Sequence, residues 1–359
     1  MPLLTVQDLV QHFPIAGSKK VVSAVNKVSF DLEPGETLAL VGESGSGKTT
    51  IGRCVLGLIR PTAGRIRYRD IEMGGRKTVR SPELRGKLQL VFQEPAESLD
   101  PRLRLFEQID EPLRALRVNR ADRERQVRAA AARVGLREAM LGLYPAEISM
   151  GLQQRVGIAR AMISEPEIVV LDEPTSALDP TARAEIIDLL IRIQRDLGTA
   201  YLFISHDLSA VRQISHRVAV LYLGMIVEQG PAAKLFARPS HPYSVGLLSA
   251  VLLPNPTIRR ESRISLAGEI PSPIDLPRAC YLASRCPMVE ARCRARMPEV
   301  ETVEPGHEVR CYRHEEVVRD ADAVDYFARF QAEAERILGA GMPPQVVAGQ
   351  PMKGNDDHG

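Results

Sequence analysis

The sequence predicts an α/β fold built around a largely parallel sheet, and three observations support that prediction. Short apolar runs recur through the first part of the chain, and each ends in glycine-rich or polar residues. Helical patterns separate successive runs, which is the order of elements in parallel sheets. One run, residues 37–41, leads directly into a glycine-rich loop at residues 42–50, and a helical pattern follows it. Strand, glycine loop and helix in this order are typical of phosphate-binding α/β folds.

The glycine-rich loop matches the phosphate-binding pattern G-x-x-x-x-G-K-[ST]. Glycines let the backbone wrap closely round a polyphosphate, and the helix that follows adds N–H groups and a partial positive charge. We expect Lys48 to reach the β- and γ-phosphates and the Thr49 hydroxyl to bind Mg²⁺. The predicted nucleotide-binding residues of this loop are Gly42, Glu43, Ser44, Gly45, Ser46, Gly47, Lys48, Thr49 and Thr50.

Composition bounds the classes of protein to which the chain can belong. Its 359 residues are 44% hydrophobic and 26% charged, which is typical of a soluble globular protein with one large or two modest domains. The net charge is +2, from 47 basic and 45 acidic residues, so there is no electrostatic case for a nucleic-acid partner. No apolar run approaches the roughly 18 residues that span a bilayer, and no signal peptide is recognised. We therefore expect a cytosolic chain whose membrane role, if it has one, comes through partners.

Before the loop, alternating apolar and polar residues predict an antiparallel sheet. Residues 4–6, 21–25 and 28–32 are expected to be strands, and residues 60–92 hold another region of short strands. Phe13 is expected in a loop between the first two. Its ring could stack on a nucleotide base or fill the core, and the residues alone leave both readings open.

Polar side chains follow three further apolar runs, and they suit the hydrolysis of a bound nucleotide. Gln93, Asp172 with Glu173, and His206 each stand where a predicted parallel strand ends, so they should meet at one edge of the sheet. Asp172 suits Mg²⁺, held directly or through water. Glu173 suits the general base that activates the attacking water. Gln93 could orient that water, and His206 could contact the γ-phosphate from the other side.

Two charged helices are predicted between these runs, and both carry recognisable ends. The first covers about residues 123–134, with Asn119 before it and Gly135 after it. The second covers residues 182–197 and ends at Gly198.

Taken together, these motifs resemble the nucleotide-binding subunit of an ATP-binding cassette (ABC) transporter. The resemblance covers residues 1–250, and it implies a P-loop NTPase fold with an antiparallel β-subdomain and a helical subdomain at about 97–160. ATP and Mg²⁺ are the implied cofactors, and Thr49, Gln93 and Asp172 are the residues implied to bind Mg²⁺. The implied catalytic residues are Glu173, His206 and Gln93. Asp179 takes the position of the loop after the acidic strand, and Phe13 the position of a base-stacking aromatic.

Two such cassettes pair head to tail in this family, so each ATP also meets a signature segment of the other subunit. Here that segment reads Ile-Ser-Met-Gly-Leu at residues 148–152, where Leu-Ser-Gly-Gly-Gln is usual. Ser149, Gly151 and Gln153 are expected to act on the partner's ATP. Met150 places a thioether where a glycine would bring the backbone close to phosphate. Either the ATP on the partner's loop is hydrolysed poorly, or Ser149 and Gly151 suffice.

The C-terminal part resembles the extension of oligopeptide and dipeptide import ATPases, in residues 241–243, 266–273, 285–287 and 306–311. Residues 93–102 look more like the second of two ATPase subunits in such systems. The resemblance implies a heterodimer with a second, different ATPase, two transmembrane permease subunits and a solute-binding protein, at the cytoplasmic face of the bacterial inner membrane. Nickel, opines, glutathione or sugars are alternative solutes, and a mainly regulatory nucleotide-binding subunit is an alternative role. A cassette acting on DNA or the ribosome is less favoured, because no second cassette or coiled-coil insertion is seen.

The extension is predicted over residues 251–315, followed at 316–359 by a helix, about 326–338, and a disordered tail. It holds four cysteines, Cys280, Cys286, Cys293 and Cys311, whose spacing is not a standard zinc pattern. The resemblance implies a [4Fe–4S] cluster on these four residues, and free structural thiols are the alternative.

Overall fold

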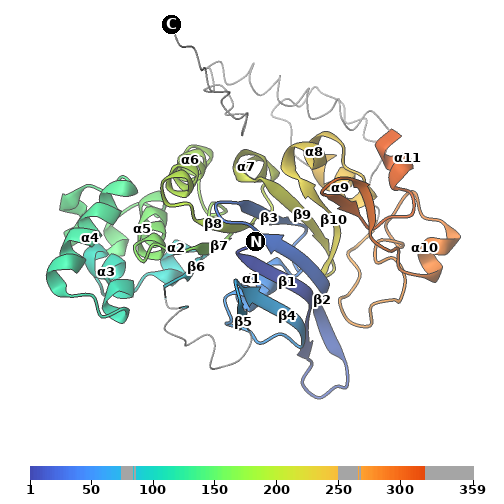
Figure 1. Ribbon diagram of the computed structural model, residues 1–359, viewed down its shortest axis with the longest axis horizontal. Helices are drawn as coiled ribbons and strands as arrows, with labels where there is room; N and C mark the ends of the chain where they lie inside the picture. Colours follow the sequence, from blue (N-terminus) through green and yellow to red (C-terminus); the bar gives the residue numbers. More distant parts are fainter. Residues whose placement is uncertain (74–83, 85, 250–265, 267, 320–359) are drawn as a thin grey trace, which may run out of the picture.

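The computed structural model describes residues 1–73, 84, 86–249, 266 and 268–319. A sheet of eight strands in the order β11-β12-β10-β9-β3-β8-β7-β6 forms its centre (Figure 1). The strands from β9 to β6 run parallel, and β10, β12 and β11 continue the sheet antiparallel. The bounds are β3 (Thr37–Val41), β6 (Leu88–Val91), β7 (Ile168–Asp172), β8 (Ala200–Ile204), β9 (Arg217–Tyr222), β10 (Met225–Pro231), β11 (Glu301–Glu304) and β12 (His307–Val309).

A second, antiparallel sheet has the order β2-β1-β4-β5. In the sequence, β1 and β2 precede the glycine-rich loop at residues 42–50, and β4 and β5 follow it. Its strands are β1 (Leu4–Pro14), β2 (Val21–Leu32), β4 (Ala63–Tyr68) and β5 (Ile71–Met73). The antiparallel sheet was expected, but two details of the expectation are wrong. The runs 21–25 and 28–32 form one strand, and Phe13 lies in β1 opposite Val22, not in a loop.

Helices surround the parallel strands, and α3, α4 and α5 form a group at one end of the molecule (Figure 1). Asn119 begins α4 by accepting the Asp122 backbone N–H, and Gly198 ends α6 in the left-handed conformation at φ 67°. Both helix ends were expected. The helices are α1 (Lys48–Val55), α2 (Pro95–Ser98), α3 (Leu105–Ala115), α4 (Arg120–Arg133), α5 (Met150–Met162), α6 (Pro180–Leu197), α7 (Leu208–Ile214), α8 (Ala232–Ala237), α9 (Pro242–Ser249), α10 (Ala291–Ala295) and α11 (His314–Arg319), with 3-10 turns at Glu138–Gly142 and Pro145–Glu147.

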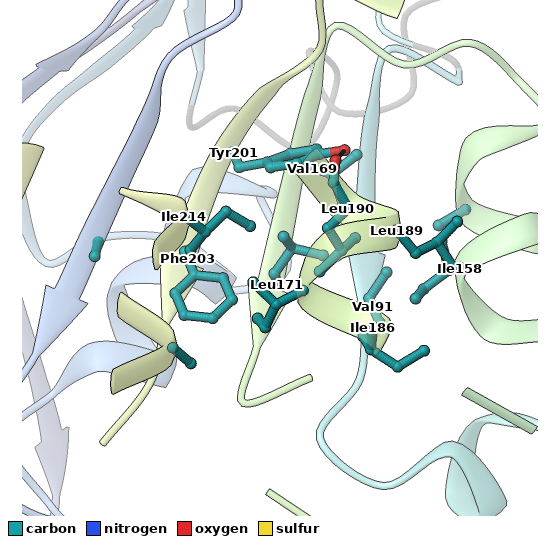
Figure 2. Close-up of a cluster of buried hydrophobic side chains, with 14 of the residues drawn as sticks. Val91, Ile158, Val169, Leu171, Ile186, Leu189, Leu190, Tyr201, Phe203 and Ile214 are labelled. Carbon is teal, nitrogen blue, oxygen red and sulfur yellow. Dashed lines mark hydrogen bonds between the residues drawn. The ribbon is translucent and has the colours of Figure 1, made fainter. Parts of the chain in front are cut away.

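The parallel strands are buried on both faces, which explains their continuous apolar sequences. On one face, Val169, Leu171 and Phe203 pack in the cluster that includes α6 side chains such as Ile186 and Leu190 (Figure 2). On the other face, the alternate residues, such as Val170 and Ile204, join a second cluster with α1 and the antiparallel sheet. The strands are therefore fixed from both sides, and so is the edge at which they end.

The C-terminal extension is built into the main sheet, which the sequence did not suggest. Strands β11 and β12 form a hairpin that adds to β10, where Glu228 lies opposite Val309. Glu228 is fully buried and accepts hydrogen bonds from the His241 N–H at 3.0 Å and from His307 Nε2 at 2.8 Å. The predicted helix at about 326–338 and the tail lie outside the described residues. Within the described ranges, no helix is both long and apolar enough to cross a membrane.

Candidate functional site

The phosphate loop is fixed between two neighbouring backbones, and this explains two of its glycines. Gly42 has φ +153°, and a Cβ there would lie 2.2 Å from the Leu221 carbonyl oxygen of β9. Gly47 has φ +99°, and its Cβ would lie 2.2 Å from the Ala24 carbonyl oxygen of β2. Any side chain would force these backbones apart, so the loop depends on glycine at both positions.

Lys48 is buried at the start of α1, and its ammonium group contacts the loop itself. Nζ donates to the carbonyl oxygens of Gly42 at 2.8 Å and Glu43 at 3.0 Å. The side chain is only 6% exposed, and burial lowers its pKa, although the charges of Glu173, Asp172 and Glu43 partly oppose this shift. A buried cation among carbonyl groups is a strong site for an anion such as a polyphosphate.

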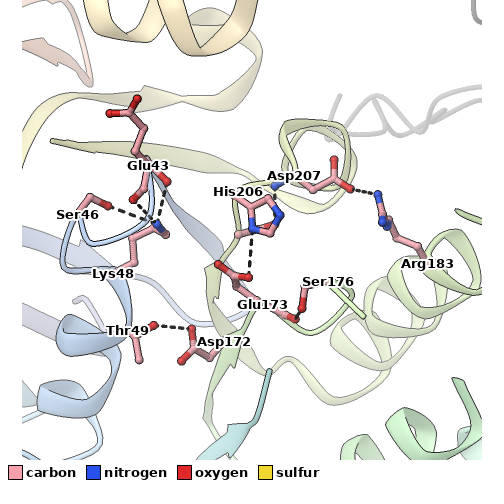
Figure 3. A network of polar contacts seen from close by, with 12 residues as sticks. Glu43, Ser46, Lys48, Thr49, Asp172, Glu173, Ser176, Arg183, His206 and Asp207 are labelled. Atoms are coloured by element: carbon pink, nitrogen blue, oxygen red, sulfur yellow. Dashed lines mark hydrogen bonds and ion pairs between the residues drawn. The ribbon is translucent and has the colours of Figure 1, made fainter. Parts of the chain in front are cut away.

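Thr49 and Asp172 meet where α1 begins and β7 ends. The Thr49 hydroxyl donates to Asp172 Oδ1 at 3.0 Å (Figure 3). Burial raises the pKa of Asp172, the nearby Glu173 charge adds to this, and the Thr49 hydrogen bond opposes it. A hydroxyl and a carboxylate are oxygen ligands of the kind that Mg²⁺ takes beside nucleotide phosphates. This donor pair therefore fits the predicted metal.

Glu173 follows Asp172 in a backbone conformation that is rare for its residue type. Its φ is 47°, and its backbone N–H donates to Ile204 O of β8 at 2.8 Å. The carboxylate lies 3.1 Å from His206 Nδ1, and the Ser176 hydroxyl donates to the Glu173 carbonyl (Figure 3). Strain of this kind persists where the surroundings fix the residue, and it is common at functional sites. The Glu173 carboxylate lies beside His206, at the edge where the strands end.

His206 precedes a hydrogen-bonded turn that was not predicted from the sequence. Asp207 caps α7 through the Ser209 and Ala210 N–H groups and accepts from Arg183 Nη1 of α6 at 2.7 Å. An Asp just before a helical pattern is a recognisable cap. No local signal, however, pairs it with an arginine 24 residues away.

Gln93 and Phe13 lie at the surface, where a ligand or partner can reach them. Gln93 is exposed just beyond β6, which pairs with β7. Phe13 is 37% exposed near the end of β1, so its ring does not fill the core. Of the two alternatives for Phe13, the structure thus favours the one in which its ring is accessible to a ligand.

The signature residues lie at the start of α5, in the helical group. Ser149 caps α5 by accepting the Leu152 N–H at 3.4 Å, and Met150 beside it is 45% exposed. Gln153 turns back and donates to the Pro145 carbonyl at 3.0 Å. A Cβ on Gly151 would meet only Ala182 at 3.6 Å, an ordinary contact. Packing within this chain therefore does not require glycine at 151.

Asp179 begins α6 by accepting the backbone N–H groups of Thr181 and Ala182, each at 3.0 Å. Its carboxylate thus has a structural role within this chain.

The four cysteines of the extension line one small cavity, together with His241 and Pro242 at the start of α9. All are free thiols, and burial raises the pKa of Cys280 to about 11 and of Cys311 to about 12. Within the part of the chain that the structure describes, no three His, Cys, Asp or Glu side chains are placed to share one metal ion. The cavity lining includes His241, Pro242, Leu282, Met288, Tyr312 and the cysteines Cys280, Cys286, Cys293 and Cys311.

Glu43 connects the phosphate loop to the extension. Its carboxylate forms a two-point ion pair with Arg285, and its backbone N–H donates to the Tyr243 hydroxyl at 2.8 Å. Neither partner was expected from the sequence, because 242 residues separate Arg285 from Glu43.

Comparison with known proteins agrees with this geometry. Residues 25–176 match the family described as ABC transporter, and residues 227–293 match the oligopeptide/dipeptide transporter C-terminal region. A probable peptide ABC transporter ATP-binding protein of Sinorhizobium fredii is 42% identical, over 86% of this chain and 89% of that protein. The oligopeptide transport ATP-binding protein OppF of Salmonella typhimurium is 41% identical, over 83% of this chain and 92% of that protein.

Solved structures agree as well. A dimer of the ATP-binding cassette MJ0796 bound to ADP and Pi has a TM-score of 0.56 at 25% identity, covering 64% of this chain and 98% of that one. The cassette cbiO1 of Clostridium perfringens, part of an ABC transporter complex, has a TM-score of 0.59 at 27% identity, covering 68% of this chain and 95% of that one. The chain therefore belongs to the ATP-binding subunits of ABC transporters, as an ATP-hydrolysing cassette that carries the oligopeptide/dipeptide transporter C-terminal region.

Proposed function

We propose that this chain powers a bacterial importer of di- or oligopeptides by hydrolysing ATP. One observation carries the proposal: a complete set of phosphate-loop, acidic and histidine residues lies at one sheet edge, in a chain that also has the oligopeptide/dipeptide transporter C-terminal region. In this proposal Lys48 binds the β- and γ-phosphates, Thr49 and Asp172 hold Mg²⁺, and Glu173 activates water. His206 contacts the γ-phosphate, and Gln93 reports its presence to the membrane subunits.

The assembly is part of the same proposal. A second, different ATPase subunit would pair with this chain, and two permease subunits and a solute-binding protein would complete the importer at the cytoplasmic face of the inner membrane. The names of the relatives, which include peptide transport and OppF, support the peptide importer within this arrangement. The division into an ATPase domain at 1–250, an extension at 251–315 and a terminal segment at 316–359 is also proposed.

The test is reconstitution of the complex. The tagged full-length chain is purified from detergent-solubilised membranes, its co-purifying subunits are identified, and the complex is placed in liposomes with its solute-binding protein. Labelled peptides should accumulate only when ATP is present on the cassette side. Accumulation of nickel, opines, glutathione or sugars in place of peptides would replace the proposed solute class. Retained nucleotide binding without turnover would favour a regulatory subunit.

The signature segment at residues 148–152 has Met150 and Leu152 where glycine and glutamine are usual. Met150 is exposed at the start of α5, so in a head-to-tail pair its side chain would meet the ATP bound by the partner. We expect the double variant Met150→Gly/Leu152→Gln to raise the ATPase rate of the reconstituted complex. Met140→Gly is the control. Met140 lies in the 3-10 turn Glu138–Gly142 of the helical group and outside the signature segment, so this variant should not raise the rate. An unchanged rate in the double variant would mean that Ser149 and Gly151 suffice.

We also propose that the four extension cysteines hold a [4Fe–4S] cluster. The support for this proposal is that all four cysteines line one small cavity. Four cysteine thiolates are the usual ligands of a [4Fe–4S] cluster, and each thiolate binds a different iron. Bound there, the cluster would cross-link a segment that has little apolar core of its own.

Iron and acid-labile sulfide analysis after anaerobic purification tests the cluster. About four iron atoms per chain are expected, with a broad visible absorption that Cys286→Ser removes. Cys54→Ser is the matched control. Cys54 lies in α1 and is buried in the core, so this variant should leave the iron content unchanged. Iron-free protein after anaerobic reconstitution would establish the cysteines as structural thiols.

A further inference from the structure

Glu43, the second residue of the phosphate loop, is held from outside the loop at two points. Arg285 Nη1 and Nη2 donate to its two carboxylate oxygens at 2.8 and 3.1 Å, and its backbone N–H donates to the Tyr243 hydroxyl at 2.8 Å. From inside the loop, its carbonyl oxygen accepts from Lys48 at 3.0 Å. Figure 3 shows the Glu43 carboxylate directed away from Lys48. Glu43 therefore joins the lysine of the site to the C-terminal extension.

The two external anchors are themselves rigid. The Tyr243 side chain is completely buried, and its ring packs on Tyr222 with centroids 4.7 Å apart. The Arg285 side chain is 8% exposed, lies over the Tyr222 ring and is held mainly by its two bonds to Glu43, which raise its pKa. A two-point arginine–carboxylate pair fixes direction as well as distance, so this contact restrains the loop strongly.

Both anchors belong to segments that surround the cysteine cavity. Tyr243 directly follows His241 and Pro242, which line that cavity, and Arg285 directly precedes Cys286. The backbone N–H groups of Arg285 and Cys286 both donate to the Leu282 carbonyl, so these residues share one tight turn. The anchors therefore connect the walls of the cavity to the phosphate loop.

From these contacts we propose that Arg285 of the extension and Tyr243 of α9 are positioning residues for ATP binding, and that they set the affinity of the phosphate loop. The Glu43 N–H is engaged by Tyr243 and does not serve the phosphates. Its anchoring fixes the start of the loop, so the N–H groups that follow are aligned before the nucleotide arrives. Preorganisation of this kind raises affinity by lowering the cost of ordering the site. The inference rests on the ATP site proposed above.

The experiment measures binding of Mg²⁺–ATPγS to the purified full-length chain by calorimetry. Arg285→Gln and Tyr243→Phe are each expected to raise the Kd about fivefold or more, because each removes one anchor. In the reconstituted complex the KM for ATP should rise more than kcat falls. Glu43→Gln is measured alone and together with Arg285→Gln. The double variant should bind no more weakly than the weaker of these two single variants, since the two side chains act as one pair.

Controls separate positioning from general stability. Arg310 is another partly buried arginine of the extension, and it donates to the Pro298 carbonyl at 3.0 Å, away from the loop. Arg310→Gln should lower the melting temperature and leave the Kd unchanged. Arg285→Lys keeps the charge without the planar fork, so it should fall between wild type and Arg285→Gln. If Arg285→Gln fails to fold, Tyr243→Phe still tests the proposal, because it keeps the ring and removes only the hydroxyl.

Lys48→Ala, measured in the same way, separates failure of the positioning role from failure of the proposed ATP site. Weak binding by Lys48→Ala with normal binding by Arg285→Gln and Tyr243→Phe would overturn the positioning role and leave the ATP site intact. Normal binding by Lys48→Ala would overturn the ATP site itself. Additive effects in the double variant would show that Glu43 and Arg285 act separately, against the proposal.

Discussion

Glu173→Gln is expected to lower the ATPase rate of the reconstituted complex by about 10²–10⁴-fold while ATP stays bound. The substitution keeps the size of the side chain and the amide can still contact His206, but it removes the group that accepts a proton from water. Lys48, Thr49 and Asp172 are untouched, so nucleotide affinity should not fall. The closed, ATP-bound complex should therefore accumulate, and filtration of the complex with radiolabelled ATP measures this directly.

Glu165→Gln is the matched control for this variant. Glu165 also has a positive φ, at 48°, but it is exposed in the turn after α5. Its variant tests whether an amide in a left-handed backbone position disturbs the chain by itself, and its turnover should equal that of wild type. Rapid turnover by Glu173→Gln would show that another group activates the water.

The place of Glu173 at the edge of the sheet could be predicted because it depends only on residues that are neighbours in the sequence. A strand buried on both faces needs an unbroken apolar sequence, and a polar residue directly after it must lie at the strand end. Asp172, Glu173 and His206 follow this rule, and the structure brings them together with Thr49. Their chemical roles stay predictions that the variants above test.

The error at β2 arises because a distant contact holds the strand together where the sequence looks like a turn. Asn26 and Lys27 interrupt two apolar runs and look like a turn. Lys27 has φ 53°, so the strand bulges there and continues. The Asn26 amide donates to the Leu223 carbonyl at 2.8 Å, which holds the bulge against the segment after β9. A contact between residues 197 positions apart decides this point, and no local pattern shows it.

The extension was predicted least well, since its order comes from distant partners. The hairpin β11-β12 is short and half-exposed, and it pairs with β10 where Glu228 and His307 form a buried contact. The Glu43–Arg285 pair is of the same kind. Motif matching marks Glu43 as one more loop residue, whereas the folded chain uses it as the attachment point of the extension.

Lys48→Ala is expected to weaken binding of Mg²⁺–ATP by about 100-fold and to abolish uptake. The ammonium group would make charged hydrogen bonds to two phosphates, and a bond to a charged group contributes about 1.5–3 kcal/mol. Since each 1.4 kcal/mol is about tenfold in affinity, the loss of two such bonds accounts for the effect. Calorimetry on the full-length chain and peptide uptake by proteoliposomes measure the two consequences.

This substitution also removes the donor that satisfies the carbonyl groups of Gly42 and Glu43, so the loop itself should be less stable. Lys87→Ala is the control, because Lys87 forms a surface ion pair with Glu167 at 3.1 Å and has no contact with the loop. Its binding should match wild type, since surface ion pairs contribute little. The proposed site is built around one buried cation at the head of α1. Unchanged affinity and uptake in Lys48→Ala would mean that the nucleotide is bound elsewhere, and the roles assigned to Thr49, Asp172 and Glu173 would fail with it.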